Sequence, residues 1–290
     1  MMKKTWLVTG THTGFGKELA TQLAQRDDVN LVATSRKFGQ LDYLDQYNHG
    51  QIAKVILDVT NHEQVVNAAK DAVTAFGTVD VLVNNAGLGY FGTFEESNLA
   101  DVKYMFDVNV WGLVDITREI LPIMRKQKSG VIVNFSSIGG LYSFPTLAFY
   151  HGTKYAVEGI TESIAKEVKD LGIKTMLVEP SGFRTDWAGR SSNKTMPTHE
   201  DYNQFGDFIK QMADGAHHEP GDPVKAAAII KNQVQNHLDN LPARLPLGKV
   251  SSDLAIEKYT ETLQNFKDLR NLSLSADFPE EKQLISKEQA

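Results

Sequence analysis

Short apolar runs alternate with longer amphipathic stretches over most of this chain. The runs are rich in Val, Ile and Leu, which is typical of strands covered on both faces of a sheet. They lie at residues 6–8, 29–33, 53–57, 79–83, 131–135 and 173–178. Stretches with helical spacing lie between them, among them 18–25, 65–76 and 157–168. This order predicts an α/β chain: a doubly wound Rossmann fold whose central sheet is mostly or wholly parallel and carries helices on both faces.

The alternation becomes irregular beyond about residue 180. Residues 187–221 are polar with two helical fragments; a helix over 222–238, a short strand within 241–248 and a helix over about 251–267 follow. No repeat or linker divides the chain, so we expect a single catalytic domain over residues 1–270. The polar tail at 271–290 has a composition typical of disorder.

Composition excludes several classes of site and partner. The 290 residues carry a formal net charge of −6 without a basic stripe, which argues against nucleic acid as a partner. The chain has no cysteine, so disulfides, thiol catalysis and cysteine metal sites are excluded. His217 and His218 are adjacent but have no suitably spaced third ligand, and we expect no metal.

The apolar runs are also too short for membrane or export segments. None approaches the roughly 20 residues that a spanning helix needs. The N-terminal run ends at Thr9, too early for the apolar part of a signal peptide. We therefore expect a cytoplasmic protein that does not associate with a membrane.

A glycine-rich loop follows the first predicted strand, in the sequence TGTHTGFG. Gly10, Gly14 and Gly16 stand between this strand and a helix that begins at about residue 15. Glycines let the backbone turn sharply, and the free N–H groups and dipole of a helix N-terminus attract a pyrophosphate. The loop therefore favours a dinucleotide site; a plain strand-to-helix turn is the alternative.

Three further motifs follow in order: Asp58 after the third strand, Asn-Asn-Ala-Gly at 84–87, and Tyr150-x-x-x-Lys154. With the loop, they resemble the short-chain dehydrogenase/reductase family over roughly residues 5–190, and less distinctly to about 250. Within that family the chain is most similar to NADP-preferring hydroxysteroid dehydrogenases and carbonyl reductases.

The resemblance implies a set of residues around the cofactor. The loop would hold the pyrophosphate, Asp58 would hydrogen-bond the adenine, and Asn85 to Gly87 would lie against the adenosine ribose. The segment EPSGFRTD resembles the P-G-x-x-x-T pattern that receives the nicotinamide, although Ser181 stands where the pattern has glycine. The implied cofactor set is Gly10, Thr11, His12, Thr13, Gly14, Phe15, Gly16, Ser35, Arg36, Asp58, Val59, Asn85, Ala86, Gly87, Tyr150, Lys154, Pro180, Phe183 and Thr185.

Residues after the second strand bear on the choice of cofactor. Enzymes that use NAD usually carry Asp or Glu here, bound to the ribose 2′-hydroxyl. This chain has Ser35, Arg36 and Lys37 instead. A guanidinium pairs with a phosphate through two parallel hydrogen bonds, so Arg36 favours NADP(H) over NAD(H), which remains possible. A solvated basic loop is the alternative.

The Tyr150-x-x-x-Lys154 spacing places both side chains on one face of a helix, one turn apart. The ordinary pKa of tyrosine is about 10, which is too high for an efficient base at neutral pH. An ammonium about 4 Å away would lower that pKa by about three units, before the opposing effect of burial is counted. Tyrosine and lysine at this spacing are common, so the pair gains its weight from the other motifs.

Two more positions complete the implied catalytic set. Ser137 lies thirteen residues before Tyr150 and would hydrogen-bond the substrate oxygen. Asn109 matches the asparagine that connects the lysine to solvent. The alternatives are a strand-end turn for Ser137 and a helix kink or cap for Asn109.

These residues predict an NADP(H)-dependent oxidoreductase that reduces a ketone or aldehyde, or oxidises the matching secondary alcohol, with Tyr150 as the acid or base. Tyr90, Phe91 and residues 141–146 and 187–221 are expected to form the site of a small apolar substrate. Family resemblance also implies a homodimer or homotetramer built on the helices that carry Asn109 and Tyr150. Two other functions stay open: an NADP-binding redox-sensing regulator, and a nucleotide-sugar-type epimerase or dehydratase.

Overall fold

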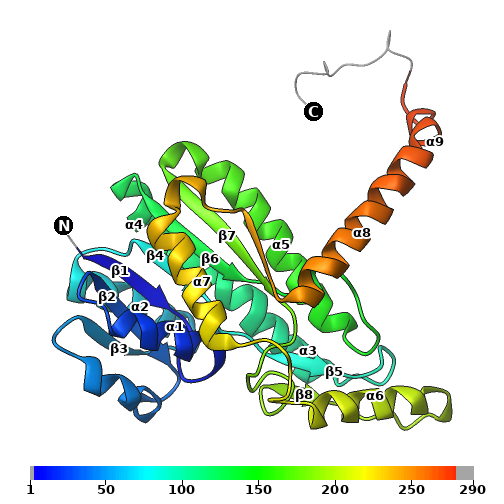
Figure 1. Ribbon diagram of the computed structural model, residues 1–290, viewed down its shortest axis with the longest axis horizontal. Coiled ribbons are helices and arrows are strands. Elements are labelled where there is room, and N and C mark those ends of the chain that lie inside the picture. Colours follow the sequence, from blue (N-terminus) through cyan, green and yellow to red (C-terminus); the bar gives the residue numbers. More distant parts are fainter. Residues whose placement is uncertain (1–2, 279–290) are drawn as a thin grey trace.

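A seven-stranded parallel sheet forms the centre of the protein, as a computed structural model that describes residues 3–278 shows (Figure 1). The strand order is β3-β2-β1-β4-β6-β7-β9, and every neighbouring pair is parallel. The strands are β1 (Lys4–Val8), β2 (Val29–Ser35), β3 (Ile52–Ile56), β4 (Val81–Asn84), β6 (Gly130–Phe135), β7 (Ile173–Pro180) and β9 (Arg244–Leu247). The predicted doubly wound fold is confirmed, with a wholly parallel central sheet.

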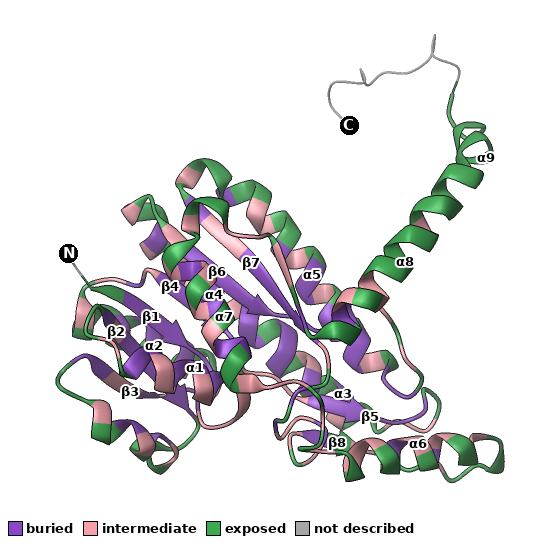
Figure 2. Ribbon diagram, viewed as in Figure 1, coloured by how far each residue is buried: buried purple, intermediate pink, exposed green. Residues whose placement is uncertain are grey.

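Helices cover both faces of this sheet, and alternate residues of each strand point to opposite faces. Trp6 and Val8 pack with the helices of one face, whereas Leu7 between them packs with those of the other. The strands are accordingly buried on both sides (Figure 2). The first face carries α1 (Gly14–Ala24), the 3₁₀ helix η1 (Phe38–Tyr47) and α7 (Pro223–Asn236); the second carries α2 (His62–Phe76), α4 (Gly112–Gln127) and α5 (Ala148–Val168).

Local signals in the sequence fix the ends of several helices. Asn61 caps α2 by accepting a hydrogen bond from the backbone N–H of Gln64, and Gly77 ends the helix with a φ of 77°. Asp222 caps α7 in the same way, directly before Pro223 at the first helical position. These helix ends set the lengths of the helical connections between neighbouring strands. The connections in turn lead the chain to the strand ends where the site forms.

Two short strands outside the central sheet escaped prediction. β5 (Gly89–Phe91) pairs with β8 (Ser192–Lys194) in a separate parallel sheet. Each has three residues, and its partner is about a hundred positions away, so local periodicity carries no signal for it. Between β5 and α4 run α3 (Leu99–Phe106) and a π-helical turn, η2 (Asp107–Trp111).

The C-terminal part leaves the body of the molecule. α6 (Asn203–Asp214) lies within the predicted polar segment, and α8 (Lys249–Asp268) projects outward, followed by α9 (Arg270–Leu274) (Figure 1). The tail predicted at 271–290 thus begins inside a short helix, and its residues 279–290 lie outside the described part of the chain. Within residues 3–278, no helix is long and apolar enough to cross a bilayer. The remaining 3₁₀ turns are η3 (Ile138–Gly140), η4 (Lys169–Leu171), η5 (Glu200–Tyr202) and η6 (Leu238–Asn240).

Candidate active site

A cavity of about 650 Å³ opens beyond the carboxyl ends of the central strands. This is where open parallel sheets bind ligands. Most residues that the sequence predicts for the site line it: Gly10, His12, Thr13, Gly14, Phe15, Ser35, Arg36, Asp58, Val59, Asn85, Ala86, Gly87, Ser137, Tyr150, Lys154, Pro180, Phe183 and Thr185. Residues from six separate loops therefore meet at one edge of the sheet.

Three predicted residues lie behind the lining. Thr11 is buried, and its hydroxyl donates to the carbonyl oxygen of Thr34 at 3.1 Å. Gly16 lies inside the first turn of α1, and Asn109 lies in the π-helical turn η2. Their contacts support the loops that reach the cavity.

The glycine loop depends on two kinds of close approach. Gly10 and Gly14 have φ angles of +69° and +56°, which favour glycine. A Cβ on Gly16 would come within 2.4 Å of both Gly10 O and Asn85 Nδ2. Asn85 in turn donates to Thr9 O at 2.9 Å and to Gly10 O at 3.0 Å. The asparagine after β4 thus fixes the loop after β1, which explains why both motifs occur together.

Positive charge gathers beside this loop. The pKa of His12 is lowered by burial and by the nearby guanidinium groups of Arg36 and Arg190, while Asp186 acts in the opposite direction. His12 Nδ1 is buried without a hydrogen-bond partner among the described residues. A cavity wall with two guanidinium groups, an unpaired imidazole nitrogen and a helix N-terminus fits the phosphates of a dinucleotide.

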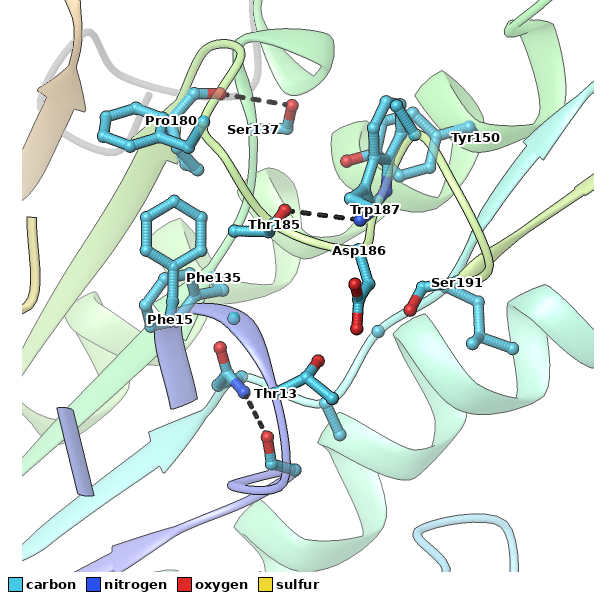
Figure 3. A pocket seen from close by; sticks show the side chains of 18 of the residues that line it. Thr13, Phe15, Phe135, Ser137, Tyr150, Pro180, Thr185, Asp186, Trp187 and Ser191 are labelled. Atoms are coloured by element: carbon cyan, nitrogen blue, oxygen red, sulfur yellow. Dashed lines mark hydrogen bonds between the residues drawn. The ribbon is translucent and has the colours of Figure 1, made fainter. Parts of the chain in front are cut away.

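Tyr150 and Lys154 project from consecutive turns of α5 into the cavity. Lys154 Nζ lies 5.8 Å from the centre of the Tyr150 ring and donates to Phe135 O, at the end of β6, at 2.8 Å. Tyr150 shares a hydrogen bond with Ser137, whose hydroxyl also accepts from the backbone N–H of Gly139 at 3.0 Å. Figure 3 shows Ser137 and Tyr150 on the same side of the cavity, beyond Thr185. The structure brings the three side chains together.

Asn109 lies one layer behind Lys154. Its Nδ2 donates to Leu88 O at 2.9 Å and to Thr153 Oγ1 at 3.1 Å, and its Oδ1 accepts from Leu88 N at 2.7 Å. A Cβ built on Gly87 would lie 3.4 Å from Asn109 Oδ1 and 3.8 Å from Lys154 Nζ. The side chain therefore anchors the segment after β4 beside the lysine. Its place in a π-helical turn is typical of functional sites.

The family follows from comparisons with known proteins. The family model for short chain dehydrogenase matches residues 4–195. Oxidoreductase calM of Penicillium decumbens is 36% identical over 284 residues, which cover 93% of this chain and 91% of that protein. The chain belongs to the short-chain dehydrogenase family. The resemblance to this family that the motifs indicated is confirmed.

Other relatives of this short-chain dehydrogenase agree in fold. A 3-ketodihydrosphingosine reductase of Bacteroides thetaiotaomicron is 36% identical over 203 residues, 70% of this chain and 72% of that protein. A short-chain dehydrogenase of Streptomyces avermitilis is 34% identical with a TM-score of 0.86, over 96% of this chain and 100% of that one.

Two further solved structures hold nicotinamide cofactors. A Burkholderia phymatum enzyme in complex with NAD is 25% identical with a TM-score of 0.79, covering 91% of this chain and 95% of that one. ElxO with NADP bound is 30% identical with a TM-score of 0.69, covering 85% and 97%. The protein is thus an NAD(P)-dependent oxidoreductase that acts on CH–OH or C=O groups.

Burial, which the sequence-based expectation left uncounted, dominates the electrostatics of the Tyr150–Lys154 pair. Burial raises the pKa of Tyr150 to about 12, and the hydrogen bond from Ser137 opposes this only in part. Burial also lowers the pKa of Lys154 to about 8, against the nearby charge of Glu158. Burial disfavours the charged form of each group and so moves the two pKa values in opposite directions, because both side chains are almost fully covered by protein.

A cluster of charged side chains that the sequence did not predict lies one turn beyond Lys154. Glu158 of α5 and Glu179 of β7 are both buried and contact the guanidinium of Arg244 at 2.6 Å and 2.5 Å. Glu162, on the exposed side of α5, contacts the same guanidinium. Burial and the charge of Glu158 raise the pKa of Glu179 to about 7. Strand β9 thus supplies the counter-charge to carboxylates next to the catalytic helix.

The substrate side is partly different from the prediction. Tyr90 and Phe91 are buried behind the cavity, where Tyr90 bonds Thr195 and the backbone of Asn98. Trp187, from the predicted segment 187–221, does line the cavity, with its ring 4.9 Å from that of Tyr150 and 5.4 Å from that of Phe91 (Figure 3). β5 and β8 turn Tyr90 and Phe91 inward, and strands of three residues gave no sequence signal of this.

His151, next to Tyr150, also went unnoticed in the sequence. Its Nε2 accepts from the backbone N–H of Phe144 at 2.8 Å, and its Nδ1 bonds Gly139 O at 2.9 Å. Burial lowers the pKa of His151, which suits a neutral ring with one donor and one acceptor nitrogen. The ring fastens residues 139–144 to the helix that carries Tyr150.

Proposed function

We propose that this short-chain dehydrogenase is an NADP(H)-dependent reductase of ketones or aldehydes, similar to carbonyl reductases and hydroxysteroid dehydrogenases, and catalyses the reverse oxidation of secondary alcohols. One observation carries the proposal: Tyr150, Lys154 and Ser137 line the same cavity as the glycine loop and Arg36. A cofactor held by the loop would thus end beside an acid or base.

NADP(H) is the proposed cofactor because of the charge beside β2. Arg36 is exposed at the cavity, where its five N–H groups are free to meet a 2′-phosphate in the bidentate geometry that a guanidinium favours. Ser35 is buried, and its hydroxyl donates to Lys37 O at 2.7 Å, which orients the turn that carries Arg36. No carboxylate stands here to repel the phosphate.

The remaining cofactor contacts follow the shape of the cavity. Asp58 and Val59 would hold the adenine, and Asn85, Ala86 and Gly87 the adenosine ribose. The loop from Gly10 to Gly16 would hold the pyrophosphate, with Thr11 and Gly16 shaping it from behind. Phe183 and Thr185 with Pro180 would hold the nicotinamide; all three line the cavity, and the Phe15 and Phe183 rings are in tilted contact there, with ring centres 5.0 Å apart.

Chemistry would then proceed at Tyr150. The nicotinamide supplies a hydride to the carbonyl carbon in one direction and accepts it in the other. Tyr150 donates its proton to the developing alkoxide, and a phenol with a pKa of about 12 is fully protonated at neutral pH and ready for this role. Ser137 hydrogen-bonds the same oxygen.

Lys154 would stabilise the phenolate that forms when the proton leaves. Its position, held by the carbonyl of Phe135, keeps the ammonium near the ring throughout. Asn109 positions Gly87 and Leu88 around it, as its hydrogen bonds to Leu88 allow. The catalytic set proposed is therefore Asn109, Ser137, Tyr150 and Lys154.

The proposed substrate is a carbonyl compound with an apolar body. Phe144, Leu147, Trp187 and Met212 line the cavity around Tyr150, and Trp187 packs directly on its ring. Polar groups at this end are few, as in sites for apolar ligands generally. The similarity to a 3-ketodihydrosphingosine reductase, whose name describes a ketone on an apolar chain, supports the same class.

The test is NADPH consumption with a panel of ketones, aldehydes and quinones of increasing apolar size. We expect turnover with apolar ketones, and Tyr150→Phe should lower kcat about 10²–10⁴-fold while the Kd for NADPH changes little. Tyr155→Phe is the matched control, since the Tyr155 hydroxyl bonds Leu141 O outside the cavity.

Full activity of Tyr150→Phe would exclude Tyr150 as the acid. Tight NADPH binding without turnover of any substrate would favour a redox-sensing regulator. A product in the same oxidation state as the substrate would favour an epimerase or dehydratase.

A homodimer or homotetramer in the cytoplasm is proposed for the assembly and location. The support is the family membership, together with the absence of cysteine from the sequence. Light scattering on the purified protein measures the oligomeric state. Fractionation of the source cells shows the location.

A further inference from the structure

Helix α8 makes almost no contacts over most of its length. It has 20 residues, of which only Ser251 is buried. Its contacts with the body are with β9 and η3, near its beginning, and Ser251 donates to Glu179 O there. From Ile256 onward nearly every residue is exposed, and the helix points away from the molecule (Figure 2).

The exposed part of α8 is not uniformly polar. Ile256, Tyr259, Leu263 and Phe266 have exposed fractions of 64%, 51%, 53% and 69%. Their spacing of three, four and three residues places them on one side of the helix, as positions a and d of a heptad repeat. All b, c and f positions from residue 257 onward are polar: Glu257, Lys258, Glu261, Gln264, Asn265 and Asp268.

Such a surface is unusual for a helix in water. Most helices in proteins owe their stability to packing of an apolar face rather than to intrinsic helix propensity. A contiguous exposed apolar surface marks a site of interaction.

We propose that α8 pairs in an antiparallel manner with α8 of a second copy of this chain, around a two-fold axis near Glu261. In this register Ile256 lies opposite Phe266 of the second copy, and Tyr259 opposite Leu263, each pair occurring twice. The surface is self-complementary, as a two-fold interface requires. It is separate from α4 and α5, the helices through which the family resemblance implies assembly.

Charge supports both the partner and the direction. Asp253 and Lys267 occupy the e positions, and the antiparallel register brings Asp253 of each copy opposite Lys267 of the other. A parallel pair would instead set Ala255 against Thr260 and Thr262 against Lys267, with no opposite charges. The contact of Asp253 with Lys249 of its own chain is exposed and leaves Asp253 free to exchange partners.

The orientation and the net charge exclude other arrangements. Because the body of the protein lies at the N-terminal end of α8, antiparallel pairing places the two bodies at opposite ends of the helix pair. A helix that binds anionic membranes carries mostly Lys and Arg on its polar face. α8 has three lysines and four acidic residues, so its charge does not favour a lipid surface.

The first test removes the apolar stripe. Light scattering across a concentration series should give an even-numbered oligomer for the wild-type chain, and half that mass for the double variant Leu263→Glu/Phe266→Glu. Gln264→Glu/Asn265→Glu adds the same charge on the outward side and should keep the wild-type mass. NADPH binding by all three proteins shows that the body has folded.

The second test reads the register. Lys267→Asp alone should raise the dissociation constant of the α8 pair about tenfold or more, as loss of an interface ion pair does. Adding Asp253→Lys should return the dissociation constant most of the way to the wild-type value. Restoration is specific to an antiparallel pair of identical helices.

Three outcomes would overturn the proposal: a wild-type monomer at every concentration, an unchanged mass for Leu263→Glu/Phe266→Glu, or no recovery in the charge-exchange variant. Wild-type chain that stays monomeric but sediments with phosphatidylglycerol vesicles would assign the stripe to a membrane surface instead. None of these outcomes depends on catalytic activity.

Discussion

The glycine loop at residues 9–16 and the segment at 181–195 border one cavity, yet they present different surfaces to it: backbone from the loop and large side chains from the segment. The loop is fixed by hydrogen bonds to its backbone: Asn85 bonds Thr9 O and Gly10 O, and the hydroxyl of Tyr43 bonds Thr11 O at 2.6 Å. The later segment is also tied by backbone hydrogen bonds, as at β8, but side chains form its cavity-facing part: Trp187 packs on Phe91 and Tyr150, and the Asp186 carboxylate bonds Arg190.

This difference separates the parts of the site that tolerate change from those that do not. Backbone hydrogen bonds at the edge of a buried sheet leave no room for another geometry, so substitutions there affect every substrate alike. Side-chain packing at the cavity mouth can change with each residue. The cofactor side is therefore shared by the fold, and the substrate side is where specificity arises.

The largest expected effect comes from a substitution in the glycine loop. Gly16→Ala would place a methyl group within 2.4 Å of Gly10 O and Asn85 Nδ2, and neither group can move without loss of a hydrogen bond. We expect a cost of about 3 kcal/mol, seen as a roughly hundredfold weaker Kd for NADPH, a lower Tm, or both. Gly159→Ala is the control, because a Cβ there meets nothing within 4 Å in the middle of α5. Normal binding by Gly16→Ala would show that the loop is less constrained than its contacts indicate.

The next effect changes the cofactor without changing the substrate. Ser35→Asp/Arg36→Ala should shift the ratio of kcat/KM for NADPH over NADH about ten- to a hundredfold toward NADH, because two charge-assisted hydrogen bonds are lost and a repelling carboxylate is gained. Lys37→Ala, one residue further along the loop, serves as the control. An unchanged ratio would remove Arg36 from cofactor selection.

A smaller effect sharpens the comparison from the substrate side. Trp187→Ala should open space beside Tyr150. We expect KM to rise about tenfold for small apolar ketones, because they lose a contact, and kcat/KM for bulkier ketones to rise relative to that for small ones. The KM for NADPH should stay within a factor of about two of the wild-type value, because Trp187 is expected to contact the substrate rather than the cofactor. Trp111→Ala, at a position that is 63% exposed, is the control. Equal effects on all substrates and on NADPH would mean that Trp187 holds the fold rather than selects the substrate.

The smallest effect concerns the charge beside Lys154. The negative charge of Glu158 raises the pKa of Lys154, so Glu158→Gln should lower that pKa further below its value of about 8. The ammonium is lost as pH rises through this pKa, and the decline of reductase kcat at alkaline pH should therefore begin about 0.5–1 unit lower. Glu162→Gln is the control, since Glu162 contacts Arg244 from the exposed side, one turn further along α5. A shift toward higher pH would contradict the sign of this interaction.

Much of the cofactor side was predictable because its signals are local. The loop glycines and Asn85 lie within a few residues of a strand end, Tyr150 and Lys154 lie one turn apart on one helix, and the strands themselves show in the apolar pattern. The set of lining residues predicted there was largely found at the cavity. The effect of burial on the pKa of Tyr150 was not predictable from the sequence, because the extent of that burial depends on Trp187 and other side chains distant in the sequence.

The sequence by itself determined the alternation of the central strands with helices, the family, and the residues that repeat the motifs of that family. Only the tertiary structure decided that Trp187 rather than Tyr90 faces the reacting groups, that Arg244 neutralises Glu158 and Glu179, and that α8 leaves the body with an apolar side exposed. The reason is physical. Periodicity and turn residues act over a few positions of the chain, whereas burial and charge pairing are set by contacts between segments that only the folded sheet brings together.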